Sequence, residues 1–166
     1  MALISDDDHP VKAELENRFP NYSISGPIAG TYGEVWILSR EGKIAQAIKV
    51  ISPHSNTDSS DEELEIFERE MALSFKIPPN INVISIYGFV KPRIFYSDSD
   101  RQAGKFVPAL RMKGMQGSLE DWTTNPSAAS LENRLIAFVQ ALSGLKHLYP
   151  HGFEGHGDIK QSNFLY

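Results

Sequence analysis

The chain has 166 residues, a formal net charge of −5 at pH 7, 41% hydrophobic residues and no cysteine. This length and apolar content are typical of one packed domain or slightly more. The lack of cysteine excludes disulfides, thiolate zinc sites and cysteine nucleophiles, and the lack of a basic block argues against nucleic-acid binding. With no apolar run long enough to span a membrane and no secretory signal in residues 1–10, we expect a soluble, intracellular protein of the cytoplasm.

The first predicted elements are a short helix over residues 11–18 and a hairpin over residues 22–38. Residues 20–21 break the helix, and the second half of the hairpin is rich in residues that favour strands. Gly30 and Gly33 lie at the turn, where the backbone can bend without Cβ clashes. Their N–H groups could bind the oxygens of a phosphate, although an ordinary hairpin turn would carry the same glycines.

The next predicted strand, over residues 44–51, contains a lysine in an unusual position. Alternation places Lys49 on one face with Ala45, Ala47 and Ile51. A lysine among small and apolar side chains requires a partner or a ligand. The alternative is an edge strand whose lysine reaches water with its ammonium group.

The helix predicted over residues 61–77 contains a carboxylate in an apolar position. Glu70 falls in the stripe formed by Ile66, Leu73 and Ile77. A carboxylate there is costly without a cation, and Lys49 faces the same difficulty with the opposite charge. We therefore predict an ion pair between Lys49 and Glu70, unless Glu70 lies at the edge of the stripe and is hydrated.

Two further elements are predicted in the second half of the chain, a strand over residues 106–112 and a long amphipathic helix over residues 131–148. Alternation points Leu110 and Met112 inward in the strand. Ser118, between the two elements, is a natural N-cap for a helix start. The stripe of the long helix consists of Leu135, Phe138, Val139, Leu142, Leu145 and Leu148.

The last residues of the sequence, 156–166, combine three polar residues with phosphoryl-transfer chemistry. Asp158 can accept a proton from a hydroxyl, and Lys160 can hold a transferring phosphoryl group. Asn163 can offer its carbonyl oxygen to a hard cation such as Mg²⁺. A turn in which the aspartate and asparagine have ordinary hydrogen-bond partners would show the same residues.

The ordered set of these motifs resembles the eukaryotic protein-kinase domain over about residues 20–166. Residues 156–163 resemble the catalytic loop H-R-D-L-K-x-x-N. Residues 28–35 resemble the Gly-rich loop G-x-G-x-x-G-x-V, with Ile28 in place of the first glycine. Residues 47–49 match three positions of V-A-I-K.

The resemblance implies an α+β, protein-kinase-like fold with an antiparallel five-stranded N-lobe, one long helix and the first helices of an incomplete helical C-lobe. It implies an N-terminal extension at residues 1–20, an N-lobe at 21–112, and a hinge and partial C-lobe at 113–166. Lys160 favours the Ser/Thr class. Gly157 replaces the usual arginine, which suggests control by something other than a phosphorylated activation loop.

The resemblance also implies transfer of the ATP γ-phosphoryl group to a protein hydroxyl, with ATP and Mg²⁺ as cofactors. Asp158 would orient the hydroxyl and take its proton, Lys160 would stabilise the transferring charge, and Asn163 would bind Mg²⁺. Lys49, held by Glu70, would position the phosphates. The implied nucleotide-binding residues are Ile28, Gly30, Gly33, Val35, Ala47, Lys49, Met112, Lys113 and Met115.

The sequence lacks one segment that the resemblance requires for activity. No Asp-Phe-Gly segment occurs in the 166 residues, so we expect negligible phosphotransfer by them alone. The stripe of residues 131–148 would then be exposed and could bind a partner. Residues 156–158 also fit a small-molecule phosphotransferase of the aminoglycoside-kinase type. The missing segment also fits a non-catalytic, pseudokinase-like binding module.

Overall fold

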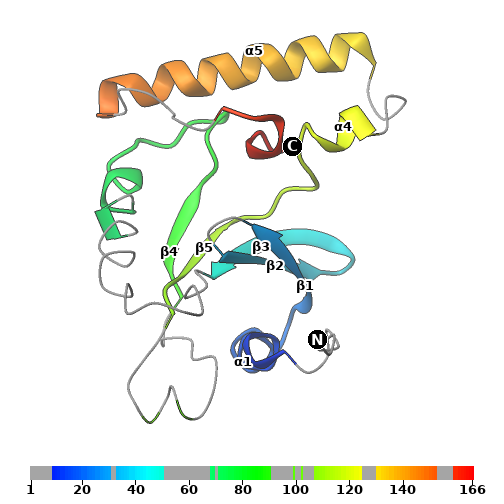
Figure 1. The fold of residues 1–166 in the computed structure, drawn as a ribbon, viewed down its shortest axis with the longest axis vertical. Coiled ribbons are helices and arrows are strands. Elements are labelled where there is room, and N and C mark those ends of the chain that lie inside the picture. Colours follow the sequence, from blue (N-terminus) through cyan, green and yellow to red (C-terminus); the bar gives the residue numbers. More distant parts are fainter. Residues whose placement is uncertain are drawn as a thin grey trace. The chain divides into compact units, whose positions relative to one another are not determined.

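The computed structural model describes residues 9–30, 33–50, 71–90, 107–124, 130–152 and 159–166, with the single positions 68, 69, 99 and 102. It shows an α+β chain with a five-stranded antiparallel sheet and a long helix near the C-terminus (Figure 1). The chain divides into two compact units. Unit 1 comprises Met1–Glu65 and Ile86–Gly114, and unit 2 comprises Ile66–Ser85 and Met115–Tyr166. The predicted α+β class and five-stranded antiparallel sheet are confirmed.

The sheet belongs to unit 1 and has the strand order β1-β2-β3-β5-β4. Its strands are β1 Ser23–Gly30, β2 Gly33–Arg40, β3 Lys43–Val50, β4 Ile86–Phe89 and β5 Ala109–Lys113. The predicted hairpin and the strand after it are therefore confirmed. The last predicted strand, residues 106–112, is observed as β5 at Ala109–Lys113, which ends one residue later than predicted. Phe106 lies outside the described residues, and Val107 forms only a single bridge.

A two-residue turn joins β2 to β3. Glu41 and Gly42 have φ values of 53° and 73°, and the flanking Arg40 and Lys43 are paired. Positive φ at both positions is the type I′ geometry, whose twist matches that of the flanking strands. Glu41 is exposed and takes this conformation without the local hydrogen bonding that makes asparagine suitable for it.

Helix α1, Pro10–Arg18, packs against one face of this sheet. Its two large apolar residues, Val11 and Leu15, are fully buried. They join the core cluster of the strands, whose largest members are Trp36, Leu38, Ile48 and Val50. The sequence places residues 1–20 in an N-terminal extension, whereas in the structure α1 supplies part of the hydrophobic core of unit 1.

A histidine fixes the start of α1. The Nδ1 atom of His9 accepts the N–H of Val11 at 3.3 Å, which makes His9 the N-cap. Its Nε2 lies 3.4 Å from the Oε1 of Glu34, and its ring meets the Trp36 ring edge-on at 5.0 Å. Because Nδ1 accepts a hydrogen bond, the proton of a neutral ring is on Nε2, which can donate to Glu34. The first turn of α1 is thereby joined to β2.

In unit 2, helical residues precede Pro78 and helices return after residue 120. Residues 71–74 are helical, and the helix ends at Ser74. The sequence predicts this helix to residue 77, so the prediction is about one turn too long. Met71 is the most buried of these residues, at 8% exposure, although the predicted stripe does not contain it. Glu70 lies outside the described residues.

The later helices of unit 2 are α4, Asp121–Thr124, and α5, Leu131–Leu148. The predicted bounds of α5 are confirmed, and Ser130 is its N-cap, with its hydroxyl accepting the N–H of Asn133 at 3.2 Å. Short 3-10 helices follow at Tyr149–His151 and Gln161–Asn163.

One side of α5 is held close to the segment after Pro78. Gly144 is buried, and a Cβ atom there would lie 2.5 Å from the carbonyl oxygen of Asn82. The Nε2 atom of His147 donates to the carbonyl oxygen of Pro78 at 3.1 Å. The guanidinium of Arg134 donates to the carbonyl oxygen of Trp122 at 3.3 Å. Much of the apolar stripe lies on another side and is exposed, as predicted.

Candidate functional site

The strand register of unit 1 brings the predicted nucleotide-binding residues onto one face of the sheet. Val35 of β2 is the cross-strand partner of Lys49, and Lys49 is the partner of Leu110 in β5. One step along the strands, Ala47 is the partner of Met112. Directly opposed residues point to the same side of a sheet, as do residues two apart in one strand. Val35, Ala47, Lys49 and Met112 therefore share a face, together with Leu110, which is fully buried.

Ile28 extends this row onto the outermost strand. It pairs with Val35 across β1 and β2, next to a register irregularity between Ser25 and Ile28. Ile28 is 57% exposed, Ala47 is 5% exposed, and Lys49 is half-buried. The row thus runs from an exposed aliphatic side chain to a small buried one, with the lysine beside them. We call these residues, Ile28, Val35, Ala47, Lys49 and Met112, the Lys49 face.

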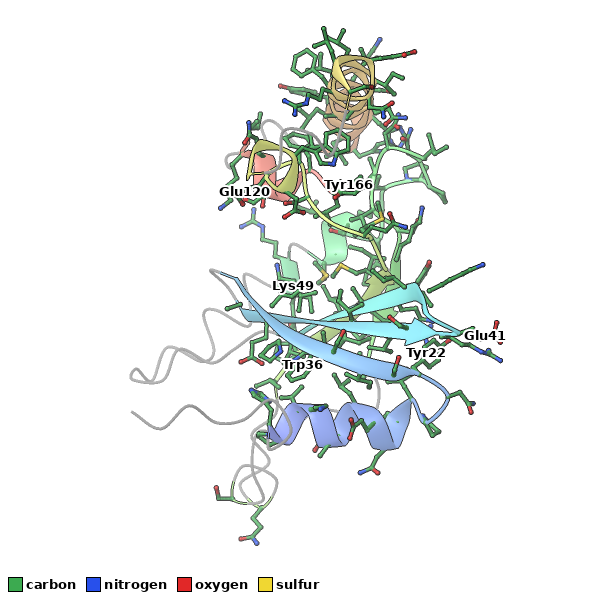
Figure 2. The ribbon with its side chains drawn as sticks, turned by 90° about the vertical axis from the view of Figure 1, so that its right-hand side faces the viewer. Tyr22, Trp36, Glu41, Lys49, Glu120 and Tyr166 are labelled. Carbon is green, nitrogen blue, oxygen red and sulfur yellow. The ribbon has the colours of Figure 1, made fainter. Side chains whose placement is uncertain are left out.

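The opposite face of the sheet is filled by the core. Trp36, Ile48 and Val50 alternate with the residues of the Lys49 face and pack with α1. Figure 2 shows Trp36 between the sheet and α1, with Lys49 on the other side of the strands. The two faces differ in chemistry as well as position, because one is closed by apolar packing and the other carries a cationic group.

Lys49 has no salt bridge with any carboxylate among the residues that the structure describes. Its predicted partner, Glu70, is not among them, so the ion pair stays a prediction. Lys49 is half-buried, with Val35 opposite it and Ala47 two residues before it on the same face, so its ammonium group requires a partner or a ligand, as inferred from the sequence.

The predicted Gly-rich turn closes the β1–β2 hairpin. Gly30 and Gly33 are the last paired residues of β1 and β2, and residues 31–32 between them lie outside the described part. Gly33 has φ of 139°, a backbone conformation that side chains with a Cβ rarely adopt. Gly33 is therefore required by the backbone conformation of the hairpin, whether or not it also binds a phosphate.

The predicted hinge coincides with the boundary between the units. Lys113 is exposed and ends β5, Gly114 is the last residue of unit 1, and Met115, which is half-buried, is the first residue of this part of unit 2. A Cβ on Gly114 would lie 2.5 Å from the Cγ2 of Ile44 and 2.9 Å from the backbone nitrogen of Gln46. Only glycine fits, because the chain leaves the sheet in contact with the backbone of β3.

The predicted catalytic segment lies in unit 2, where its second half is described. Lys160 is exposed and extended, and Asn163 is exposed and ends a 3-10 turn. Asp158 lies outside the described residues. No group of three or more histidine, cysteine, aspartate or glutamate residues that could hold a metal ion occurs in the described part of the chain. Asn163, which the sequence predicts as a ligand of Mg²⁺, is among the described residues.

The chain after Asn163 pairs with the stretch that follows the hinge. The carbonyl of Phe164 accepts the N–H of Leu119 at 2.8 Å, and the N–H of Tyr166 donates to Gly117 at 3.0 Å. Ser118 and Leu165 form an antiparallel bridge between them. Within unit 2, this ladder holds the segment of Lys160 and Asn163 next to residues 116–119.

Side chains reinforce this ladder. The Trp122 and Tyr166 rings lie 5.0 Å apart, and the Asp121 carboxylate accepts the backbone N–H of Ser118 at 2.6 Å. The Ser118 hydroxyl also donates to that carboxylate, at 3.4 Å. Ser118, which the sequence predicts as an N-cap, lies three residues before α4 begins at Asp121, and its hydroxyl donates instead of accepting a backbone N–H. The Asp121 carboxylate reaches back to the serine, as the third residue of a capping box does.

Two features of the site were not identified from the sequence. Ile37 pairs with Ala47 and lies on the Lys49 face, and its position two residues after Val35 was the available signal. The ladder between Phe164–Tyr166 and the post-hinge stretch had no signal, since it joins residues about 46 apart in the chain through backbone groups.

Comparison with known proteins gives no relative from which a function can be read. No protein-family model and no curated protein matches this sequence. None of the helices in the described ranges is both long enough and apolar enough to cross a membrane.

Proposed function

We propose that the chain is a protein-kinase-like domain of the Ser/Thr type, which binds ATP with Mg²⁺ and serves transfer of the γ-phosphoryl group to a protein hydroxyl. The observation that supports this most strongly is the register of unit 1. It collects Val35, Ala47, Lys49 and Met112 on the sheet face that α1 leaves uncovered. These are residues that the motif resemblance assigns to the nucleotide.

The Lys49 face fits a nucleotide in its chemistry. Val35, which is half-buried, offers an aliphatic surface on which a purine ring can pack, and the buried Ala47 on the same face adds only a small side chain beside it. Lys49 offers a cation to phosphate oxygens. Ile28 and Met112 border the same surface, and Gly30 and Gly33 close the hairpin beside it.

The hinge adds backbone groups for the edge of the base. Lys113 and Met115 flank Gly114, whose own N–H points to the carbonyl of Ala45 at 3.4 Å. The backbone groups of Lys113 and Met115 are therefore the candidates for hydrogen bonds to the adenine edge.

Unit 2 supplies the groups that act on the acceptor in this proposal. Asp158 would orient the acceptor hydroxyl and take its proton, while the hydroxyl oxygen bonds to the γ-phosphorus and the bond from that phosphorus to the β,γ-bridging oxygen breaks, so that ADP leaves. Lys160 stabilises negative charge on the transferring group. Asn163 gives a carbonyl oxygen to Mg²⁺, which neutralises phosphate charge when bound. Lys160 and Asn163 directly precede the residues that pair with 116–119, Phe164 and Tyr166.

Nucleotide binding tests the proposal directly. The chain is titrated with ATP and Mg²⁺ and binding is measured by calorimetry, for the wild type, Lys49→Ala and Lys43→Ala. We expect the Lys49 variant to bind roughly 10- to 100-fold more weakly, since hydrogen bonds to charged groups contribute about 1.5–3 kcal/mol. Lys43→Ala is a matched control, because Lys43 begins the same strand, is exposed, and pairs with Arg40 away from the Lys49 face.

Two results would contradict the proposal. One is a wild-type chain that binds no ATP at millimolar concentration. The other is an equal loss of affinity in both lysine variants, which would indicate nonspecific attraction of the phosphates. A third variant, Ile28→Asp, sharpens the test, because Ile28 is 57% exposed, so the substitution should leave the fold intact while it puts a negative charge beside the surface proposed for the nucleotide.

A non-catalytic binding module is the second candidate function. The observation that favours it is the exposed apolar side of α5, where Phe138 is 59% exposed and Leu131 is 74% exposed. Such a surface is typical of a site for another macromolecule. In this case Lys49→Ala leaves the interaction unchanged, whereas a charged substitution on α5 abolishes it.

A further inference from the structure

A carboxylate in β2 joins helix α1 to the predicted Gly-rich turn. Glu34 directly follows Gly33, and its Oε1 atom lies 3.4 Å from the Nε2 of His9, the N-cap of α1. The other carboxylate oxygen, Oε2, is shielded from solvent and has no hydrogen-bond partner among the described residues. A shielded carboxylate oxygen is costly without a donor. The carboxylate of Glu34 therefore depends on the N–H that His9 can direct to Oε1.

Glu34 is also the point at which the Gly-rich turn leaves the body of the sheet. It is paired on both sides, with Ala29 of β1 and with Val50 of β3. Gly33, one residue earlier, pairs with Gly30 but has no partner in β3, because that strand ends at Val50. The tip of the hairpin is thus attached to the rest of the sheet through Glu34. The position of this residue sets the direction in which the turn extends.

The imidazole that faces Glu34 is itself held in one orientation. Its Nδ1 accepts the N–H of Val11 at 3.3 Å, and its ring meets the Trp36 ring edge-on at 5.0 Å. Val11 and Trp36 are both fully buried, so these contacts are made with fixed parts of the core. The side chains of His9 and Glu34 are only 16% and 20% exposed. The contact between them is therefore preorganised, unlike a contact between two flexible surface side chains.

We propose that His9 is a positioning residue for nucleotide binding, which fixes the Gly-rich turn through Glu34 and so couples the docking of α1 to the affinity for ATP. This inference rests on the proposed function, because that function assigns the phosphates to the turn of Gly30 and Gly33. Without its donor, the shielded carboxylate turns toward water and moves the backbone next to Gly33. A turn that samples more conformations loses more entropy when it orders around a phosphate, so the affinity falls.

His9 acts from behind the surface proposed for the nucleotide. Alternation along β2 places Glu34 and Trp36 on one face of the sheet and Val35 on the other. Figure 2 shows Trp36 between the strands and α1, with Lys49 on the other side of the strands. The sheet thus separates His9 from a nucleotide on the Lys49 face. An effect of a His9 substitution on ATP affinity would therefore be transmitted through β2 and not through direct contact.

The first experiment measures ATP binding by calorimetry, with Mg²⁺, for the whole chain and for His9→Asn. Asparagine can still cap α1, but its shorter side chain does not reach Glu34, so we expect roughly 3- to 10-fold weaker binding. Arg18→Ala is the matched control, because Arg18 ends α1 and pairs with Glu14 of the same helix at 2.8 Å. Its affinity should stay within about twofold of the wild type. Equal losses in the two variants would indicate general loosening of α1 and would overturn the inference.

Substitutions of Glu34 test the route of this coupling. Glu34→Ala should weaken ATP binding about as much as His9→Asn, and the double variant should bind no more weakly than either single variant, since both remove the same contact. Glu34→Gln retains an oxygen that can accept from Nε2, so it should recover most of the affinity that Glu34→Ala loses. Losses that add in the double variant would mean that the two residues act independently, which overturns the route through Glu34.

The backbone amide NMR signal of Gly33, recorded without nucleotide, reports the turn independently of ATP binding. We expect His9→Asn to shift or broaden this signal and Arg18→Ala to leave it unchanged. If the wild type binds ATP and His9→Asn binds it equally well, the inference is overturned and the proposed function stands. If the wild type binds no ATP, the proposed function is overturned and the role of His9 in binding falls with it. The Gly33 signal then still decides whether α1 controls the turn.

Discussion

The large apolar side chains of helix α1 are buried, whereas most of those of helix α5 are exposed. In α1, which is largely polar, Val11 and Leu15 are both fully buried under the sheet of unit 1. In α5, which is twice as long, six apolar residues are exposed, and the residue that is buried is Gly144, which has no side chain. The comparison teaches that apolar content alone does not decide burial, because burial requires a complementary surface nearby.

The same contrast explains how each helix is fixed in place. α1 is held by hydrophobic contact with the strands and by His9, which caps it and reaches Glu34. α5 is held in unit 2 by backbone approach at Asn82 and by polar side chains such as His147. Substitutions should therefore destabilise the two helices by different mechanisms, which the following experiments separate.

The largest expected effect is that of Leu15→Ala in α1. It should lower the free energy of unfolding by about 2–5 kcal/mol, since it leaves a cavity in a fully buried site. Leu135→Ala on α5 is the matched variant and should change it by less than about 0.5 kcal/mol. Urea unfolding followed by tryptophan fluorescence, at submicromolar protein, measures both. Similar losses in the two variants would remove the distinction between the helices.

Gly144→Ala should destabilise the chain by about 1–3 kcal/mol, although alanine is the better helix former. The reason is the carbonyl oxygen of Asn82, which lies 2.5 Å from the position of the new Cβ. Ser143→Ala, on the exposed neighbouring position, should be neutral or slightly stabilising. If Gly144→Ala stabilises α5, the close approach to Asn82 does not exist in solution, and the helix has no tight contact at that point.

His9→Ala should cost about 1 kcal/mol, the usual contribution of an N-cap. His9→Asn supplies a side-chain oxygen that can accept the N–H of Val11 in place of Nδ1, so it should recover part of that loss. The part that it does not recover measures the contacts of the imidazole with Glu34 and Trp36. A fully restored stability in His9→Asn would show that capping alone fixes the start of α1.

Glu41→Asn provides a small effect away from both helices. Because Glu41 is exposed and has positive φ in a type I′ turn, asparagine should stabilise the hairpin by about 0.5 kcal/mol. The measurement is the urea midpoint of the same unfolding curve. A loss of stability instead would mean that the Glu41 side chain stabilises the turn.

The candidate site was predictable in its residues and less so in its arrangement. Alternation along β3 is enough to place Ala47 and Lys49 on one face. Their neighbours depend on the strand order, in which β5 lies between β3 and β4 although β4 precedes it in the chain. Met112 thus becomes the partner of Ala47 through pairing with a strand more than 60 residues away. Such pairing leaves no local pattern in the sequence.

The sequence by itself determined the elements whose cause is local. The periodicity of residues 131–148 and the N-cap preference of Ser130 fix α5, and β-branched and apolar alternation fixes the strands of the hairpin. Local patterns also selected Lys49, because an ionised side chain among apolar neighbours contradicts the rest of its strand. These features depend on residues within a few positions of one another, so they can be seen without the fold.

Only the tertiary structure decided which apolar side chains are buried and which backbone segments meet. It placed the mostly polar α1 in a hydrophobic core, left the apolar side of α5 exposed, and required glycine at 114 and 144. Each outcome depends on a neighbour that is distant in the chain, such as Ile44 beside Gly114 or Asn82 beside Gly144. Hydrophobic burial and close packing are properties of the assembled surfaces, so they appear only when those surfaces meet.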